Sequence, residues 1–317
     1  EDLHWRDEMA RLLSLWTVIA MMLAGCASVA SGSTGSGPTV IDGVIFTASS
    51  PEGGAEIYRL DADGVPANLS NHEGADNWPE YSPDGSKILF QSRRNGAFDL
   101  FVMEADGSGL RQLTDDPDHD YVASWSPDGT EIYFGSWRVE AGDEARSVHF
   151  YVMNADGSGQ RRFMRDSPGA SGALAPSSDG TRFLFAKKIS EDVAEIFVFV
   201  RATGEVRQLT FDGVSAGSPS WSPDGARFAY YSDRGDEGSS IIVIDADGSD
   251  RRTLIGEGFN WYPRWSADGG AIIYTAAADG AAQADLDIRA IRVEGNLSFV
   301  TIAGGPGKQS EGSFPPK

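Results

Sequence analysis

The sequence has one cysteine and four histidines in 317 residues. A single thiol, that of Cys26, excludes an internal disulfide, a Cys-x-x-Cys redox pair and a cysteine-rich zinc site. The histidines stand alone, without the His-x-x-x-His or Glu-x-x-His spacing that places two metal ligands on one helix face. We therefore expect no metal site and no cofactor.

Basic residues are also scarce, because 26 Lys and Arg stand against 47 Asp and Glu and give a formal charge of -21. A protein that binds nucleic acid needs a basic face to replace the counterions of the phosphates. This balance argues against DNA or RNA as a partner. A strong net charge also favours a soluble monomer, which is what we expect here.

The chain offers little that could span a membrane. Its apolar run from Leu12 to Leu23 is too short for a stable span, but it follows Met9-Ala10-Arg11 and ends in Leu-Ala-Gly-Cys26, an order typical of a secretion signal. Leu-Ala-Gly-Cys resembles the bacterial lipobox, in which the cysteine is lipidated and becomes the new first residue. A buried helix with a stray cysteine is the alternative, but the Gly/Ser-rich residues 31–37 favour a flexible tether.

These features predict three segments. Residues 1–25 are a leader and lipoprotein signal peptide, and the four acids among residues 1–8 indicate that the true start is Met9. Residues 26–40 comprise the lipidated Cys26 and the tether, and residues 41–317 form the folded domain. The expected location is outside the cytoplasm, with the lipid on Cys26 in the cell membrane or outer membrane and the domain in the periplasm or outside the cell.

Glycine and proline are abundant, with 38 and 15 residues, which favours an all-β fold with frequent tight turns. An internal repeat agrees with frequent turns: an aromatic-Ser-Pro-Asp-Gly motif recurs at steps of 44, 51, 45 and 44 residues. One copy has the reduced form Ser-Ser-Asp-Gly, and the last has alanine in place of proline. Proline presets φ, aspartate bonds its own backbone and glycine accepts positive φ, so the motif reverses the chain between two strands. Its glycines are Gly85, Gly129, Gly180, Gly225 and Gly269.

Each period contains two apolar strands after the motif, then an Ala-Asp-Gly turn and a short strand that ends in Gln-Leu-Thr in the clearest copies. Four strands in about 45 residues are the signature of a propeller blade. Residues 44–47, 57–60 and 62–64 match the second strand, the third strand and the turn of a further unit that lacks its inner strand. Residues 310–315 supply that strand, which closes the ring without an open edge. We predict an all-β fold, a six-bladed β-propeller of four-stranded antiparallel blades, with Tyr81, Trp125, Trp221 and Trp265 packed between blades.

This combination of motifs resembles the WD-like repeats of the TolB-type β-propeller family over residues 41–317. The resemblance is specific for the fold and says little about function. TolB itself carries a separate mixed domain before its propeller and is a soluble periplasmic protein. The present chain has barely fifteen residues between Cys26 and the first expected strand, so the resemblance does not by itself imply the envelope-complex role of TolB.

No catalytic constellation emerges. Gly213-Val214-Ser215-Ala216-Gly217 matches the Gly-x-Ser-x-Gly pattern, but that chemistry needs a strand-to-helix turn, and we expect a loop between blades here. Asp245-x-Asp247-Gly248-x-Asp250 begins like a calcium loop but lacks the later bidentate glutamate. We predict a non-catalytic binding scaffold. The alternative is a carbohydrate-active or peptide-cleaving enzyme that uses carboxylates at the channel mouth.

One face of the ring is the predicted binding surface. Chain direction alternates, so loops between the second and third strands emerge on the same face as loops between blades. The cationic and aromatic side chains on this face suit an envelope protein, a peptide or a saccharide as the ligand. The alternative, weighed about evenly, is that the aromatic rings pack the inner strands and the cations neutralise nearby acids such as Asp118 and Asp120. The predicted ligand-binding residues are Trp78, Arg93, Arg94, His119, Tyr121, Trp137, Arg138, Lys187, Arg234, Trp261 and Tyr262.

Overall fold

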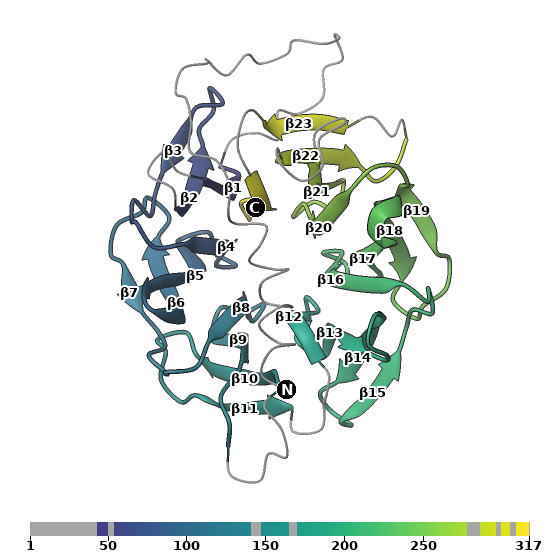
Figure 1. The fold of residues 1–317 in the computed structure, drawn as a ribbon, viewed down its shortest axis with the longest axis horizontal. Helices are drawn as coiled ribbons and strands as arrows, with labels where there is room; N and C mark the ends of the chain where they lie inside the picture. The colour runs from purple at the N-terminus through teal and green to yellow at the C-terminus, as the bar shows by residue number, and fades with distance from the viewer. Residues whose placement is uncertain are drawn as a thin grey trace.

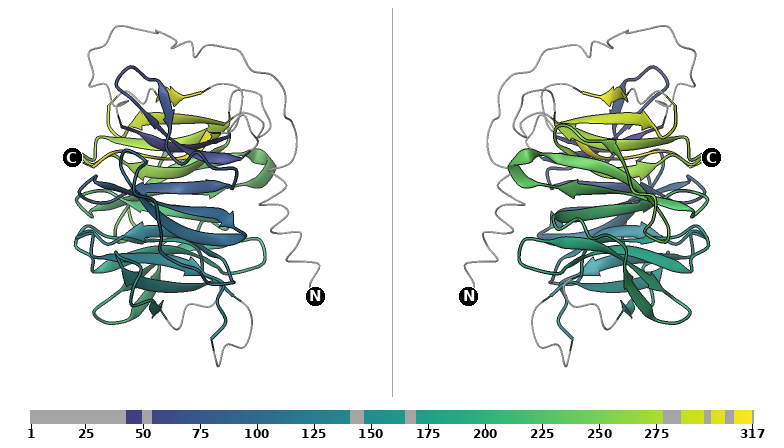
Figure 2. Two further views of the ribbon diagram at one scale, coloured as in Figure 1. Left: turned by 90° about the vertical axis from the view of Figure 1, so that its left-hand side faces the viewer. Right: turned by 90° about the vertical axis from the view of Figure 1, so that its right-hand side faces the viewer.

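The computed structural model describes residues 43–49, 54–140, 147–164, 170–277, 286–295, 299–304 and 309–316. The predicted leader, Cys26 and the tether lie outside the described residues, and so their assignment stays a prediction. Within the described residues, strands form six four-stranded antiparallel sheets. Figure 1 shows these sheets as blades around a common axis, and Figure 2 shows the ring from two sides. The predicted six-bladed β-propeller is confirmed.

Each blade runs from an innermost strand beside the axis to an outermost strand at the rim. Blade 1 holds β24 (Gln309–Ser313), β1 (Ile45–Ser49), β2 (Ala55–Leu60) and β3 (Pro66–Asn68). Blade 2 holds β4 (Asp76–Tyr81), β5 (Lys87–Asn95), β6 (Ala97–Glu104) and β7 (Arg111–Gln112). Blade 3 holds β8 (Asp120–Trp125), β9 (Glu131–Ser136), β10 (His149–Asn154) and β11 (Arg161–Met164).

The other three blades complete the ring in the same order. Blade 4 holds β12 (Ala170–Pro176), β13 (Arg182–Lys188), β14 (Ala194–Val200) and β15 (Glu205–Gln208). Blade 5 holds β16 (Ser215–Trp221), β17 (Arg227–Asp233), β18 (Ser239–Asp245) and β19 (Arg252–Ile255). Blade 6 holds β20 (Asn260–Trp265), β21 (Ala271–Ala277), β22 (Leu286–Arg292) and β23 (Phe299–Ala303). The short turn Gly235–Glu237 is helical, and among the described residues no helix has the length and apolar character to cross a membrane.

The Ser-Pro-Asp-Gly motif forms the turn between the first two strands of a blade. In blade 2 the Ser82 hydroxyl donates to Asp84 Oδ1 at 2.6 Å and accepts from the Lys87 amide at 2.9 Å. Gly85 closes the turn with φ of 72°, in the region that glycine enters at least cost. The hydrogen bond from Ser82 lowers the pKa of Asp84 to about 2, so the turn is built around a carboxylate that stays ionised.

The aromatic residue before each motif packs between neighbouring blades, as predicted. Trp125 of blade 3 lies in one buried cluster with Leu89 and Val102 of blade 2. Trp221 of blade 5 packs against Leu184 of blade 4 and donates its indole N–H to the Ala175 carbonyl at 3.1 Å. Where a blade carries this aromatic residue, the ring joins the blade to the preceding one through apolar burial.

The closing Gln-Leu-Thr triplet ties the outermost strand back to the third strand. Thr114 Oγ1 accepts from the Leu100 amide at 3.0 Å and donates to Asp99 Oδ1 at 3.3 Å. In blade 4, Thr210 Oγ1 accepts from the Ile196 amide at 2.9 Å and donates to Glu195 in the same way. The threonine thus satisfies a buried backbone amide and a buried carboxylate at once.

The carboxyl-terminal strand closes the ring, also as predicted. β24 pairs antiparallel with β1, with Ile45 opposite Ser313 and Thr47 opposite Ser310. Phe314 then takes the interblade position that tryptophan holds elsewhere, because it is buried against Ile273 and Ile288 of blade 6. Blade 1 is therefore assembled from both ends of the described chain.

Candidate functional site

The innermost strand of every blade carries an irregularity at the same level of the channel. Each such strand shifts register against its neighbour, and each contains one residue with positive φ. These residues are Trp78 (57°), Val122 (47°), Gly172 (73°), Ser218 (45°), Tyr262 (56°) and Glu311 (57°). The left-handed conformation costs a residue other than glycine about 1–2 kcal/mol. Bulges of this kind redirect side chains, here toward the axis.

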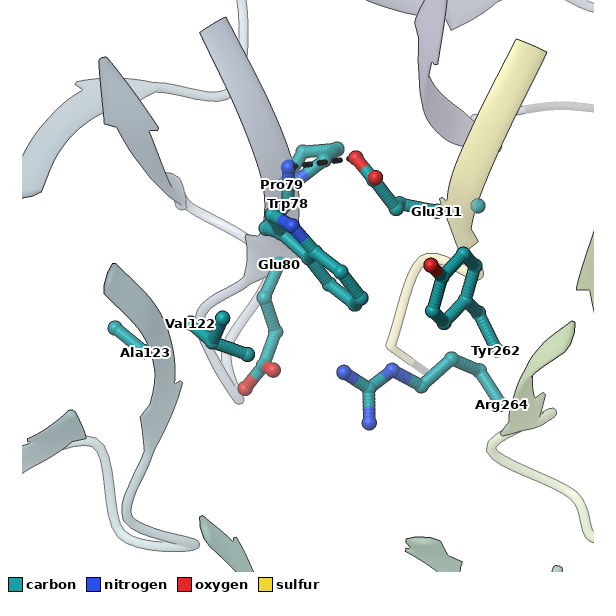
Figure 3. Close-up of a pocket in the computed structure, with 9 residues that line it drawn as sticks. Trp78, Pro79, Glu80, Val122, Ala123, Tyr262, Arg264 and Glu311 are labelled. Atoms are coloured by element: carbon teal, nitrogen blue, oxygen red, sulfur yellow. Dashed lines mark hydrogen bonds between the residues drawn. The ribbon is translucent and has the colours of Figure 1, made fainter. Parts of the chain in front are cut away.

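A cluster of channel side chains comes from three adjacent innermost strands, β4, β20 and β24, and we call Trp78, Glu80, Tyr262, Arg264 and Glu311 the channel cluster (Figure 3). The rings of Trp78 and Tyr262 meet edge to face with centroids 4.7 Å apart. The cavity that the cluster lines measures about 10 Å³, which is room for about one water molecule. The space enclosed between these side chains is thus small.

Glu311 links the closing strand to both of its neighbours. Its Oε2 accepts from the Trp78 amide of β4 at 3.1 Å and from the Thr47 hydroxyl of β1 at 2.8 Å (Figure 3). Burial raises the pKa of the Glu311 carboxyl, and these hydrogen bonds oppose that rise. Glu311 therefore has a structural task in ring closure in addition to its place beside the channel.

Glu80 lies on the opposite side of the Trp78 ring and reaches the next blade. Its Oε1 accepts from the Trp125 amide at 3.0 Å. Burial raises the pKa of Glu80, while the charge of Arg264 and the hydrogen bonds from Trp125 and Ser124 act against that rise. A buried carboxyl with a raised pKa takes up a proton more readily than an exposed one.

Arg264 differs from Arg94 and Arg138 in its hydrogen bonds and ion pairs. Among the described residues no hydrogen bond or ion pair of Arg264 is found, although its charge acts on Glu80 and Glu311. Arg94, in contrast, donates to the buried Asp76 at 3.0 Å, and Arg138 bonds the buried Asp120. The guanidinium of Arg264 points into the channel in Figure 3, where its donors are available to a ligand.

The predicted ligand-binding residues divide into two groups. Trp78 and Tyr262 belong to the channel cluster. The remaining cations contact their own blades: Arg94 and Arg138 pair with Asp76 and Asp120 as above, and Arg138 also reaches Asp116 at 3.3 Å. The other contacts join Arg93 with the Phe98 ring, Lys187 with the Phe197 ring, and Arg234 with the Ser240 hydroxyl.

The remaining predicted residues also contact neighbours in the propeller. His119 Nδ1 accepts from the Phe98 amide at 2.9 Å. Trp137 hydrogen-bonds Tyr121, and Trp261 stacks on Phe259 with centroids 5.7 Å apart. Most of the predicted face thus serves packing or neutralises acids, the alternative that the sequence left open, and its ligand-binding role stays a prediction.

Sequence reasoning missed Glu80, Arg264 and Glu311. A signal for the first two was present, since both stand five residues before the marker glycine of their repeat. The same position holds small residues in three other blades, namely Ser124, Ala175 and Ser220. In blades 2 and 6 this position carries a charged side chain, Glu80 or Arg264, so the channel lining is charged there.

The other motifs have structural positions. Ser215 of the Gly-x-Ser-x-Gly match is the first residue of β16, not part of a loop as the sequence suggested, and no helix follows it. Asp247 lies in an Ala-Asp-Gly turn and accepts from the Ser249 amide at 2.9 Å. The described portion of the chain contains no group of three or more His, Cys, Asp or Glu side chains arranged to hold a metal ion.

The six blades and the side chains of their inner strands define a six-bladed β-propeller with a lined central channel. The family model of the TolB beta propeller domain matches residues 142–301, and that of the Tricorn protease N-terminal beta propeller domain matches residues 44–195. The chain belongs to the TolB β-propeller family.

The relatives agree with this assignment. An uncharacterized protein of Agrobacterium fabrum, Atu1656, is 33% identical over 138 residues, which cover 42% of this chain and 47% of that protein. The Tol-Pal system protein TolB of Anaeromyxobacter dehalogenans is 53% identical over 45 residues, 14% of this chain and 10% of TolB. The crystal structure of TolB from Acinetobacter baumannii shares the fold with a TM-score of 0.75 and 18% identity, over 88% of this chain and 68% of that one.

Two enzymes also share part of the fold or sequence. The uncharacterized peptidase YuxL of Bacillus subtilis is 31% identical over 176 residues, 53% of this chain and 23% of YuxL. The oligogalacturonate lyase of Vibrio parahaemolyticus has a TM-score of 0.54 at 16% identity, over 84% of this chain and 75% of the lyase. The chain spans less than half the length of the curated relatives that it matches.

Proposed function

We propose that this protein is a lipid-anchored, extracytoplasmic β-propeller that binds an envelope partner and carries out no catalysis. The observation that supports this most is the channel cluster. Its carboxylates are held by backbone amides, those of Trp125 and Trp78, and the cavity beside them measures about 10 Å³. A catalytic site needs a pocket that encloses its substrate, and the cavity beside these carboxylates is too small for one, whereas a broad loop face suits a binding surface.

The proposed partner is an envelope protein, peptide or saccharide that contacts the face with the between-blade loops. Membership of the TolB family supports an envelope partner, because relatives carry the name Tol-Pal system protein. On this face Arg93 is exposed and Trp261 is half-buried. Both are therefore accessible to a partner in addition to their contacts with Phe98 and Phe259.

A crosslinking pull-down from envelope extract tests this surface. The double variant Arg93→Ala with Trp261→Ala is expected to recover less partner than the wild type. The matched control is Arg207→Ala, since Arg207 is exposed on the rim strand β15 and donates to the Asp247 carbonyl at 3.1 Å. Equal recovery by the double variant and the wild type would refute the assignment of this face.

The lipid anchor is a separate proposal that depends on the Leu-Ala-Gly-Cys sequence at residue 26. Incorporation of labelled palmitate in the native host is expected for the wild type and is expected to be lost in Cys26→Ser. The variant should also move from the membrane fraction to the soluble fraction. Label that persists in Cys26→Ser, or a wild type without label, contradicts the anchor.

The alternative is an enzyme on the same fold, a carbohydrate-active or peptide-cleaving propeller. The similarity to YuxL and to the oligogalacturonate lyase supports the enzyme as the alternative function. A screen of the mature protein on polysaccharides and peptides separates the two functions. Sustained turnover that Glu80→Gln abolishes would replace the scaffold proposal by the enzyme.

A further inference from the structure

We propose that a cavity at the seam between blades 1 and 2 binds a free amino acid with a cationic side chain, of the lysine type. The cavity lies on the face that carries the Asp-Gly turns, opposite the face with the between-blade loops, so this site is separate from the channel and from the surface proposed for the envelope partner. We call it the seam cavity. The lining residues that carry the argument are Arg59, Asp61, Tyr81, Asp84, Pro315 and Pro316.

The seam cavity lies where the first two strands of blade 1 meet without a connecting turn. In the other five blades an Asp-Gly turn joins these strands, but in blade 1 they are β24 and β1, which come from distant parts of the described chain. Pro316 lies against Gly85 as Pro83 lies against Gly129 in the next blade, so it takes the place of the proline of a turn. The described residues leave a cavity of about 320 Å³ there, within the range of about 300–1,000 Å³ that ligand pockets occupy.

Two residues of this seam depart from the repeat and make it polar. Arg59 stands three residues before the turn of its blade, and the same position elsewhere is apolar: Val102, Val152, Val198, Val243 and Ala290. In blade 2 this valine belongs to the buried cluster of Trp125, the aromatic residue of the next blade. At the seam Tyr81 stands in the place of the tryptophan, and its hydroxyl donates to the Gly43 carbonyl at 2.8 Å. A guanidinium and a phenol thus replace an apolar contact between blades.

Arg59 supplies the group that binds an anion. Its Nη1 donates to the Ala105 carbonyl of blade 2 at 2.7 Å, which holds the guanidinium across the seam. Arginine has five N–H donors, and among the described residues this carbonyl is the one acceptor found for them. The remaining donors form a planar fork that matches the two oxygens of a carboxylate.

Asp61 and Asp84 supply the groups that bind cations, one from each blade. Oδ1 of Asp61 accepts from the Asp63 amide at 3.0 Å and from the Val65 amide at 2.8 Å, which holds the carboxylate in place. Oδ1 of Asp84 accepts from the Ser82 hydroxyl, which keeps the pKa of Asp84 at about 2 and its carboxylate ionised. Within the described residues the second oxygen of each carboxylate has no hydrogen bond, so both oxygens are available to a ligand.

The ligand class follows from this charge pattern. One guanidinium and two carboxylates are complemented by one carboxylate and two cationic groups, which is the set of charges that a free basic amino acid carries. The aliphatic stem between those charges suits contact with the ring of Tyr81 and with the two prolines. A neutral saccharide offers no cation, and an inorganic anion would meet two carboxylates.

Calorimetry on the full-chain protein tests the site with L-lysine and three analogues that each lack one charged group. Cadaverine lacks the carboxylate and is expected to bind about tenfold more weakly, because the half-buried Arg59 loses a charge-assisted partner. Norleucine lacks the side-chain ammonium group, and Nα-acetyl-lysine lacks the α-ammonium group. Each is expected to bind about threefold more weakly, since Asp61 and Asp84 are exposed and contribute less.

Two substitutions separate the roles of the lining charges. Arg59→Val installs the residue that four other blades carry and should abolish the preference for lysine over cadaverine. Asp61→Asn keeps the oxygen that accepts from the turn and should weaken lysine binding about threefold. The matched controls are Arg111→Val, which removes a donor to the Asp156 carbonyl at 2.7 Å across the next seam, and Asp63→Asn in the same turn as Asp61. Both controls should leave lysine binding unchanged.

Thermal unfolding shows whether the variants are folded, and L-lysine should raise the unfolding temperature of the wild type. No binding of L-lysine to the wild type, equal binding of lysine and cadaverine, or a folded Arg59→Val that still prefers lysine would overturn the proposal. If Arg59→Val does not fold, an unchanged lysine affinity in Asp61→Asn rejects the site. The envelope pull-down with Arg93→Ala and Trp261→Ala is independent of these results, so the scaffold function and the seam cavity stand or fail separately.

Discussion

Replacement of Asp99 by asparagine tests how a buried carboxylate affects the stability of this propeller. Asp99 lies in β6, is 4% exposed, and accepts from Gln112 Nε2 at 3.1 Å and from the Thr114 hydroxyl at 3.3 Å. Burial, and next the charge of Asp120, raise the pKa of Asp99 to about 6. The folded protein therefore keeps an ionised carboxylate at neutral pH against an opposing free energy.

The magnitude follows from the difference between the folded and unfolded states. A pKa of about 6 against an unfolded value of about 3.9 corresponds to about 3 kcal/mol. Because the folded pKa is the higher one, the native state binds more protons between these values. The destabilisation is complete above about pH 7 and disappears below about pH 4. Asparagine does not titrate, but its side chain has an NH₂ group in place of one carboxylate oxygen. This group faces the NH₂ donor of Gln112, so one hydrogen bond is lost at a cost of about 1 kcal/mol.

Urea unfolding of the wild type and Asp99→Asn at several pH values measures the prediction. The variant is expected to be about 2 kcal/mol more stable at pH 8 and about 1 kcal/mol less stable near pH 4. Glu205→Gln, on the exposed rim strand β15, is the control and should not reverse sign in this way. A difference between Asp99→Asn and the wild type that is independent of pH would refute the reasoning.

Three further substitutions test the fold. Phe314→Ala should destabilise the protein by about 3–5 kcal/mol in urea unfolding, because Phe314 fills the contact between blades 6 and 1; a loss below 1 kcal/mol would contradict its role in closure. Thr210→Val should cost about 1–3 kcal/mol, since the Ile196 amide and Glu195 lose their shared partner. Ser218→Gly should stabilise by about 1 kcal/mol, because φ of 45° is strained for serine but not for glycine; no gain would argue against strain at the bulge.

The propeller could be predicted from the sequence because the turns that separate its strands are formed by residues close together in the chain. Serine, aspartate and glycine of a Ser-Pro-Asp-Gly turn bond one another within a few residues, as Ser82, Asp84 and Gly85 do. The turns fix the strand boundaries, and the aromatic before them marks the contact with the preceding blade. Even the closure by residues 310–315 was predictable, since an open inner edge in the first blade required a partner.

The channel cluster could not be predicted in the same way. Glu80, Arg264 and Glu311 come from three blades, and no local rule states which residue of an inner strand faces the axis once a bulge interrupts its alternation. The loop face shows the converse. Arg94 and Arg138 were placed on the correct face by topology, but their pairing with Asp76 and Asp120 depends on the register of β4 with β5 and of β8 with β9.

The repeated backbone strain in the channel separates what belongs to the fold from what belongs to this protein. Positive φ recurs in all six innermost strands, at residues as different as tryptophan, valine, serine and glutamate. A positive φ that every blade shares is a property of the architecture and does not by itself mark a site. The side chains at these positions do differ, however, and the large ones, Trp78, Tyr262 and Glu311, occupy three adjacent blades next to Arg264. The fold thus supplies six equivalent bulges, and the sequence makes one side of the channel chemically distinct, at the point where the two ends of the domain meet.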